Sequence, residues 1–134
     1  MARRWRVFIR WLPSSNCWPH ASDHLVLALP ITPETHHLLN AATLAHAPPG
    51  LHLVNIARGA LVDQQALLQA LDEGRLSGAT LDVTDPEPLP EGHRLYRHPC
   101  VRLTPHVSWA AQDAGEVTAR KFVVNLSRFL AGQP

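Results

Sequence analysis

The stretch LHLVNIARGALVDQQALLQAL, residues 51–71, decides the fold, because it predicts a strand, a turn and a helix in that order. Residues 52–56 form the predicted strand. Asp63 can cap the helix that follows the turn, and Gly74 closes it. Three leucines share one face of this helix: Leu67, Leu68 and Leu71. A strand followed by an amphipathic helix is the repeating unit of an α/β sheet.

Three further strands are predicted around this unit. Residues 25–29, LVLAL, form an unbroken apolar run that Pro30 ends, as is typical of a strand buried on both faces. Residues 79–83 and 101–104 are predicted to form the last two strands. Strands that alternate with helices indicate a parallel sheet with helices packed against it, so the predicted fold class is α/β.

Two more helices are expected. One runs from about Glu34 to Ala47, and the run Pro48-Pro49-Gly50 stops it. The other is a long C-terminal helix from roughly Trp109 to Leu130. Its apolar residues fall near helical spacing: Val117, Phe122, Leu126, Phe129 and Leu130. Residues 84–100 contain prolines that forbid an ordinary crossover helix, so we expect an extended or turning connection there.

The first 20 residues differ from the rest of the chain. They hold three of the four tryptophans and show no clear period of 2 or 3.6, and the first ten contain four arginines and no acidic residue. Arginines also interrupt the apolar stretch near the start, so we do not expect a secretory signal. We expect residues 1–22 to form a foreign segment ahead of one domain, residues 23–134.

Composition narrows the class of protein. The formal net charge is +1, which by itself predicts neither a nucleic acid nor a polyanionic partner. The chain has no apolar run near the roughly 18 residues that a membrane span requires, so no membrane association is expected. Cys17 and Cys100 give neither a disulfide framework nor metal-ligand spacing, which favours a reducing cytoplasmic location. The nine histidines lack matching ligand spacing, so no metal site is expected.

Ionisable residues follow three of the predicted strands. Arg58 comes after the strand at residues 52–56, Asp82 lies at the end of the next strand and Glu87 shortly beyond it. His106 follows the strand at residues 101–104. Because ligands bind outside the carboxyl ends of strands in an open parallel sheet, these side chains should meet at one edge.

Each of these residues also has a purely structural interpretation. Arg58 could be an exposed arginine beside a turn glycine, and His106 could be a satisfied structural histidine. Asp82 and Glu87 could be turn formers among prolines. Together, however, they suit the reduction of a 2-keto acid. Arginine holds a carboxylate through paired hydrogen bonds, histidine exchanges a proton near neutral pH, and a cofactor must supply the hydride.

Residues 23–134 resemble the second part of the D-isomer-specific 2-hydroxyacid dehydrogenases. Four stretches carry the resemblance: LVLALPITPET (25–35), LHLVNIARGALVDQQALLQAL (51–71), LDVTDPEPLP (81–90) and VRLTPHVSW (101–109). Within them, Asn-x-x-Arg-Gly, Asp-x-x-x-x-Glu-Pro and Pro-His follow one another in the family's order and spacing. The resemblance implies a partial Rossmann-like sheet, the C-terminal part of a dinucleotide-binding domain, with the final helix packing back towards a substrate domain.

The resemblance also implies roles for individual residues. Arg58 would bind the substrate carboxylate and carbonyl, and Glu87 and His106 would form the acid/base pair. Asp82 would contact the nicotinamide carboxamide. The expected cofactor-binding residues are Leu29, Pro30, Ile56, Ala57, Arg58, Asp82, His106, Ser108 and Trp109. The implied ligands are NAD or NADP and a small 2-keto or 2-hydroxy acid, while a homodimer is an expectation that leaves the oligomeric state open.

The family's glycine loop is the main departure. The sequence has no Gly-x-Gly and no glycine before Gly50, whereas family members hold the cofactor pyrophosphate with Gly-x-Gly-x-x-Gly. The expectation is therefore a truncated or frameshifted dehydrogenase whose own activity is impaired. The alternatives are a non-catalytic module that pairs with an intact family member and a gene-calling artefact. Neither the substrate nor the choice between NAD and NADP can be predicted.

Overall fold

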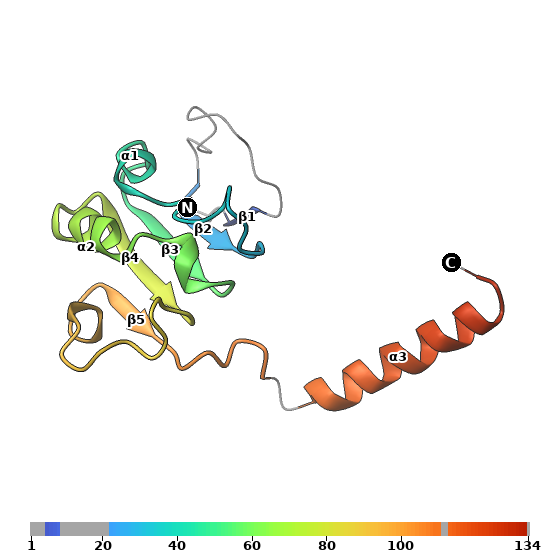
Figure 1. Cartoon of the computed structure of the whole chain (residues 1–134). Coiled ribbons are helices and arrows are strands. Elements are labelled where there is room, and N and C mark those ends of the chain that lie inside the picture. Colours follow the sequence, from blue (N-terminus) through green and yellow to red (C-terminus); the bar gives the residue numbers. More distant parts are fainter. Residues whose placement is uncertain (1–4, 9–21, 111–112, 134) are drawn as a thin grey trace.

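The computed structural model describes residues 5–8, 22–110 and 113–133 (Figure 1). Five strands form one parallel sheet in the order β1-β2-β3-β4-β5. The strands are β1 (Trp5–Phe8), β2 (His24–Leu27), β3 (Leu51–Asn55), β4 (Leu76–Leu81) and β5 (Val101–Leu103). The helices are α1 (Ala41–Leu44), α2 (Gln64–Asp72) and α3 (Ala114–Leu130), with 3-10 turns η1 (Gly59–Leu61) and η2 (Arg94–Tyr96). The predicted α/β class and parallel sheet are confirmed.

The four predicted strands are present, and a fifth was not predicted. β2, β3, β4 and β5 lie within a few residues of the predicted ranges. β1 lies in the N-terminal segment, where the sequence shows no period of two, and it extends the sheet by pairing in parallel with β2. Pairing between strands is made by backbone hydrogen bonds, so the segment can join the sheet without an alternating pattern of side chains.

The unit that decides the fold forms as predicted. Asp63 caps α2, since its Oδ1 accepts hydrogen bonds from the backbone nitrogens of Gln65 at 3.0 Å and Ala66 at 3.1 Å. Gly74 follows the helix with a φ of +68°, a conformation that glycine adopts readily. The predicted leucine face is buried in the core with residues of β2, β3 and β4: Leu25, Leu27, Leu53, Leu67, Leu68, Leu71, Leu76 and Leu81.

The predicted helix over residues 34–47 is wrong, because only Ala41–Leu44 is helical. His37 has a φ of +48°, which a right-handed helix does not permit. Ahead of it, the hydroxyl of Thr35 donates to the carbonyl of Pro30 at 2.9 Å and accepts from the nitrogen of Thr32 at 2.7 Å. Such local bonds from threonine favour turns over helix. The helix begins only where Asn40 caps it.

Residues 84–100, all of which are described, contain η2 and no α-helix, as the prolines predict. Buried Leu89 and Leu95 hold this connection against the core. The guanidinium group of Arg94 also donates to the carboxylate of Asp72, at the end of α2, at 2.9 and 3.1 Å. The segment that carries Glu87 is thus attached to the sheet domain at its distal end.

The C-terminal helix is shorter than predicted. Trp109 lies in a turn, and α3 begins at Ala114. α3 buries none of its residues, and it extends away from the sheet (Figure 1). Its large apolar side chains are exposed: Val117, Phe122, Val123, Val124, Leu126, Phe129 and Leu130. Across the described residues, no helix has both the length and the apolar character needed to cross a membrane.

Candidate active site

A buried asparagine shapes the turn that presents Arg58. Asn55, the last residue of β3, is 1% exposed. Its Oδ1 accepts a hydrogen bond from the nitrogen of Ala57 at 3.1 Å, and its Nδ2 donates to the carbonyl of Arg58 at 2.9 Å. These two bonds fold the chain back over the strand end and leave the side chain of Arg58 exposed. The sequence pattern includes Asn55, but sequence reasoning did not predict this structural role.

A groove of about 400 Å³ lies between the carboxyl ends of β2 and β3. Its lining residues are Ala28, Leu29, Pro30, Ile31, Ile56, Ala57 and Arg58. Five of these are residues predicted to bind the cofactor. Apolar walls with one cation suit a ligand that combines a flat ring with an anionic group, and this edge of a parallel sheet is where such ligands bind.

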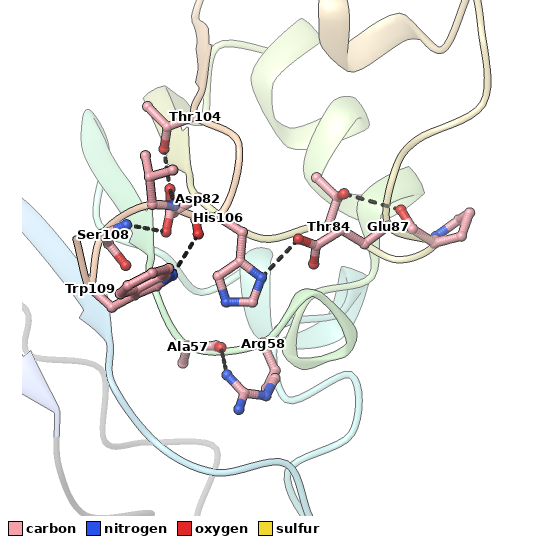
Figure 2. A network of polar contacts seen from close by, with 11 residues as sticks. Ala57, Arg58, Asp82, Thr84, Glu87, Thr104, His106, Ser108 and Trp109 are labelled. Atoms are coloured by element: carbon pink, nitrogen blue, oxygen red, sulfur yellow. Dashed lines mark hydrogen bonds and ion pairs between the residues drawn. The ribbon is translucent and has the colours of Figure 1, made fainter.

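The side chains of Glu87 and His106 meet, although 19 positions separate them in sequence. Nδ1 of His106 lies 2.8 Å from Oε1 of Glu87, and both side chains are about 40% exposed, at 40% and 41%. Figure 2 shows the Glu87 carboxylate on the Nδ1 side of the imidazole, with Nε2 on the other side of the ring. Because an ionised carboxylate only accepts hydrogen bonds, Nδ1 carries the proton. Nε2 is then the ring nitrogen that is available to form a hydrogen bond with a ligand.

Arg58 lies at the same edge of the sheet as this pair (Figure 2). Its Nη1 donates to the carbonyl of Ala57 at 2.6 Å. Within the described part of the chain, the guanidinium group forms no ion pair with Glu87 or another carboxylate. Most of its five N–H donors are therefore open to an anionic ligand.

Asp82 organises the loop that carries His106. It follows β4, is 3% exposed, and accepts three hydrogen bonds (Figure 2). Its Oδ1 accepts from the hydroxyl of Thr104 at 2.5 Å and the nitrogen of Val107 at 2.9 Å, while Oδ2 accepts from the nitrogen of Ser108 at 2.8 Å. Burial of the carboxylate acts to raise its pKa, but these bonds outweigh it and hold the pKa of Asp82 well below its ordinary value.

This arrangement adds to the role implied for Asp82 by the resemblance. An ionised carboxylate has about four acceptor positions, and the chain itself uses three of them. The bonds hold the Thr104 side chain before His106 and the backbone after it, while His106 itself adopts a φ of +55°. Trp109 adds a further contact, since its indole nitrogen donates to the carbonyl of His106 at 2.9 Å. Ser108 and Trp109, predicted at the nicotinamide, thus also stabilise the histidine loop.

Known proteins are similar to this chain in sequence and in fold. Residues 14–108 match the family described as D-isomer specific 2-hydroxyacid dehydrogenase, NAD binding domain. The chain is 45% identical over 109 residues to the glyoxylate/hydroxypyruvate reductase A of Serratia proteamaculans, covering 81% of this chain and 34% of that protein. It is 41% identical over 115 residues to the glycerate dehydrogenase of Methylorubrum extorquens, covering 84% of this chain and 37% of that protein.

Solved structures agree with these relatives. A D-isomer specific 2-hydroxyacid dehydrogenase from Xanthobacter autotrophicus Py2, in complex with NADPH and MES, is 43% identical with a TM-score of 0.71, over 86% of this chain and 47% of that one. The D-mandelate dehydrogenase of Rhodotorula graminis gives a TM-score of 0.76 at 35% identity, over 92% of this chain and 36% of that one. The chain thus spans about a third of the length of its curated relatives, and by its match to the NAD-binding domain it belongs to the D-isomer specific 2-hydroxyacid dehydrogenase family.

Proposed function

We propose that the chain carries the catalytic side chains of an NAD- or NADP-dependent dehydrogenase that interconverts 2-keto and 2-hydroxy acids. The 2.8 Å contact between Glu87 and His106 is the observation that carries this proposal. A carboxylate that fixes one nitrogen of an imidazole leaves the other to move a proton. Relatives named as glyoxylate/hydroxypyruvate reductase and glycerate dehydrogenase support a small 2-keto acid as substrate.

The groove between β2 and β3 fits a nicotinamide cofactor. Its apolar wall can contact the flat ring, and the residues we assign to this wall are Leu29, Pro30, Ile56 and Ala57. We assign Asp82, Ser108 and Trp109 to the nicotinamide side of the site, where they also support the loop of His106. When bound, the cofactor would supply or accept the hydride.

The chain's own residues would do the remaining work. Arg58 would hold the substrate carboxylate through paired, charge-assisted hydrogen bonds. In the reducing direction, the imidazolium form of His106, with a proton on each nitrogen, would donate its Nε2 proton to the substrate oxygen and become the neutral Nδ1–H form. In the oxidising direction, Nε2 of the neutral ring would take the proton back. Glu87 would keep the ring oriented through Nδ1 in both directions.

Binding and turnover of the purified chain test this proposal together. We expect oxidation of NADH or NADPH to depend on a 2-keto acid, with glyoxylate and hydroxypyruvate as first substrates. Replacement of a general acid/base lowers the rate by about 10²- to 10⁴-fold, so His106→Gln should slow this oxidation by about that factor. His46→Gln is the matched control, because His46 is exposed and outside the site. A His106→Gln variant as active as the control would refute the acid/base role.

We further propose that these 134 residues alone turn over slowly. The sequence contains no Gly-x-Gly, the pattern whose backbone holds the pyrophosphate and provides much of the cofactor's affinity. Calorimetric titration with NADH should therefore show weak binding. When a 2-keto acid is present, the substitution Arg58→Gln should still change the measured binding. Turnover at rates ordinary for enzymes, about 1–10³ per second, would contradict the proposed impairment.

The exposed apolar side chains of α3 favour a second candidate function. A module that pairs with an intact member of the same family would need such a surface, and α3 presents Phe122, Leu126 and Phe129 outside any packed core. Sedimentation of the chain mixed with a full-length family member would reveal a stable complex. Independent sedimentation of the two proteins would exclude this second function for that pair.

A further inference from the structure

The turn that carries Arg58 and the loop that carries Glu87 are in direct backbone contact. Gly59 follows Arg58 and is buried. A Cβ atom placed on Gly59 would collide with the carbonyl group of Thr84 and would lie 2.7 Å from the nitrogen of Asp85. Real Cβ atoms do not approach other atoms this closely, so the absence of a side chain at Gly59 is what allows the two loops to touch.

Gln64 joins the same two segments through its side chain. As the first residue of α2, it donates from Nε2 to the carbonyl of Asp85, two residues before Glu87. Its Oε1 is buried and has no hydrogen-bond partner among the described residues. A carbonyl can only accept, so it requires the NH₂ group of the amide. The Nε2 group of Gln64 is therefore the part of this side chain that joins the two segments.

The start of α2, which carries Gln64, is held firmly in the domain. Asp63 caps the first turn of α2, and the leucines of the helix lie in the core. Beyond the contact, the hydroxyl of Thr84 donates to the carbonyl of Pro86 at 3.0 Å, which continues the ordered backbone up to Glu87. A displacement at Asp85 would consequently be passed on to the carboxylate that contacts His106.

We propose that Gln64 is a positioning residue, which holds the loop of Glu87 so that its carboxylate meets Nδ1 of His106. The role of Gly59 is to permit the backbone contact, and that of Gln64 is to fix it with a hydrogen bond. The catalytic consequence depends on the function proposed above, but the geometric claim does not. It can be measured on the chain without any turnover.

Two glutamate substitutions separate the donor from the charge. Gln64→Glu keeps the shape of the side chain, removes the donor and places a carboxylate oxygen against the Asp85 carbonyl. Gln65→Glu adds the same charge one residue later on α2, where the side chain is exposed. Both charges lie near the helix N-terminus, which favours negative groups, so neither variant should unfold the domain. Gln64→Lys restores a donor and serves as the rescue variant.

The readout is the tautomer of His106, observed by long-range ¹H–¹⁵N NMR of the full chain at a pH where the ring is neutral. The His106 signals are assigned by their loss in His106→Gln, and Glu87→Ala provides the spectrum of a ring without its carboxylate. We expect the wild type, Gln65→Glu and Gln64→Lys to show the Nδ1–H form, and Gln64→Glu to lose it as Glu87→Ala does.

An unchanged His106 spectrum in Gln64→Glu would overturn the proposal, and so would an equal change in Gln65→Glu, which would make charge the cause. If Gln64→Glu fails to fold, Gln64→Ala and Gln64→Lys give the same comparison without the added carboxylate. Failure of the proposed function would appear differently, as absent 2-keto acid turnover and binding while the wild-type tautomer pattern is intact.

Discussion

Replacing Asp82 by asparagine tests how the loop of His106 is held. Asparagine has nearly the shape of aspartate, but one of its two terminal groups is a donor. Oδ1 can still accept from Thr104 and Val107, whereas the amide NH₂ would face the N–H of Ser108 as a second donor. The substitution therefore removes at least one hydrogen bond to a charged acceptor and weakens the other two.

The expected magnitude follows from these contacts. A hydrogen bond to a charged group contributes about 1.5–3 kcal/mol. Because Ser108 is exposed, water can partly replace its lost acceptor, which favours the lower end of that range. We expect Asp82→Asn to lower the free energy of unfolding at neutral pH by about 1.5–3 kcal/mol. Urea unfolding followed by circular dichroism measures this free energy. The control is Glu91→Gln, because Glu91 also lies between β4 and β5 and is exposed.

The pH dependence supplies a sharper test. The pKa of Asp82 is lowered in the folded protein, so its contribution to stability is complete above the unfolded pKa, about 3.9. That contribution is lost as the pH falls from this value towards the folded pKa. Asparagine does not titrate, so the stability difference between wild type and Asp82→Asn should narrow below about pH 4. A difference that stays constant or widens on acidification would refute the assignment of the three bonds to an ionised carboxylate.

Further substitutions test the packing around the site, each by urea unfolding. Asp63→Ala should cost about 1 kcal/mol by removing the cap of α2, and a neutral result would mean that the cap contributes nothing. Leu67→Ala should cost about 2–5 kcal/mol, because Leu67 is fully buried; a loss below about 1 kcal/mol would place it outside the core. Gly59→Ala should cost about 1–3 kcal/mol through the collision with Thr84, and wild-type stability would show that the loops do not touch. Phe129→Ser should change stability by less than about 0.5 kcal/mol, since Phe129 is 78% exposed; a larger loss would show that α3 is packed.

The sequence predicts those parts of the fold that side-chain pattern controls. The buried strands are apolar runs, and α2 has both a cap and a leucine face, so their positions could be derived from residue type alone. β1 could not, because backbone hydrogen bonds to β2 place it in the sheet without an alternating pattern. The long helix predicted after Glu34 also failed, because the positive φ of His37 is set by contacts of its backbone with Ala60 rather than by composition.

Part of the candidate site could likewise be predicted from the sequence, and part could not. Topology predicts that Arg58, Glu87 and His106 arrive at one edge of the sheet, and the structure places the last two in contact. Their catalytic roles stay predictions. The hydrogen bond of Gln64 to Asp85 joins residues 21 positions apart, and it depends on how closely two loops approach. Nothing in residue type or spacing marks that approach except the presence of Gly59 where its Cβ would collide.

Burial separates the residues that would perform chemistry from those that position them. Glu87 and His106 are about 40% exposed, at 41% and 40%, whereas Asn55 and Asp82 are 1% and 3% exposed and use their side chains to bind loop backbone. An exposed polar side chain contributes little to stability, and a buried one with several hydrogen bonds contributes much. Substitution of the first pair should therefore change ligand binding or turnover with little change in unfolding. Substitution of Asn55 or Asp82 should mainly lower the free energy of unfolding, because the loops that these two residues hold would relax.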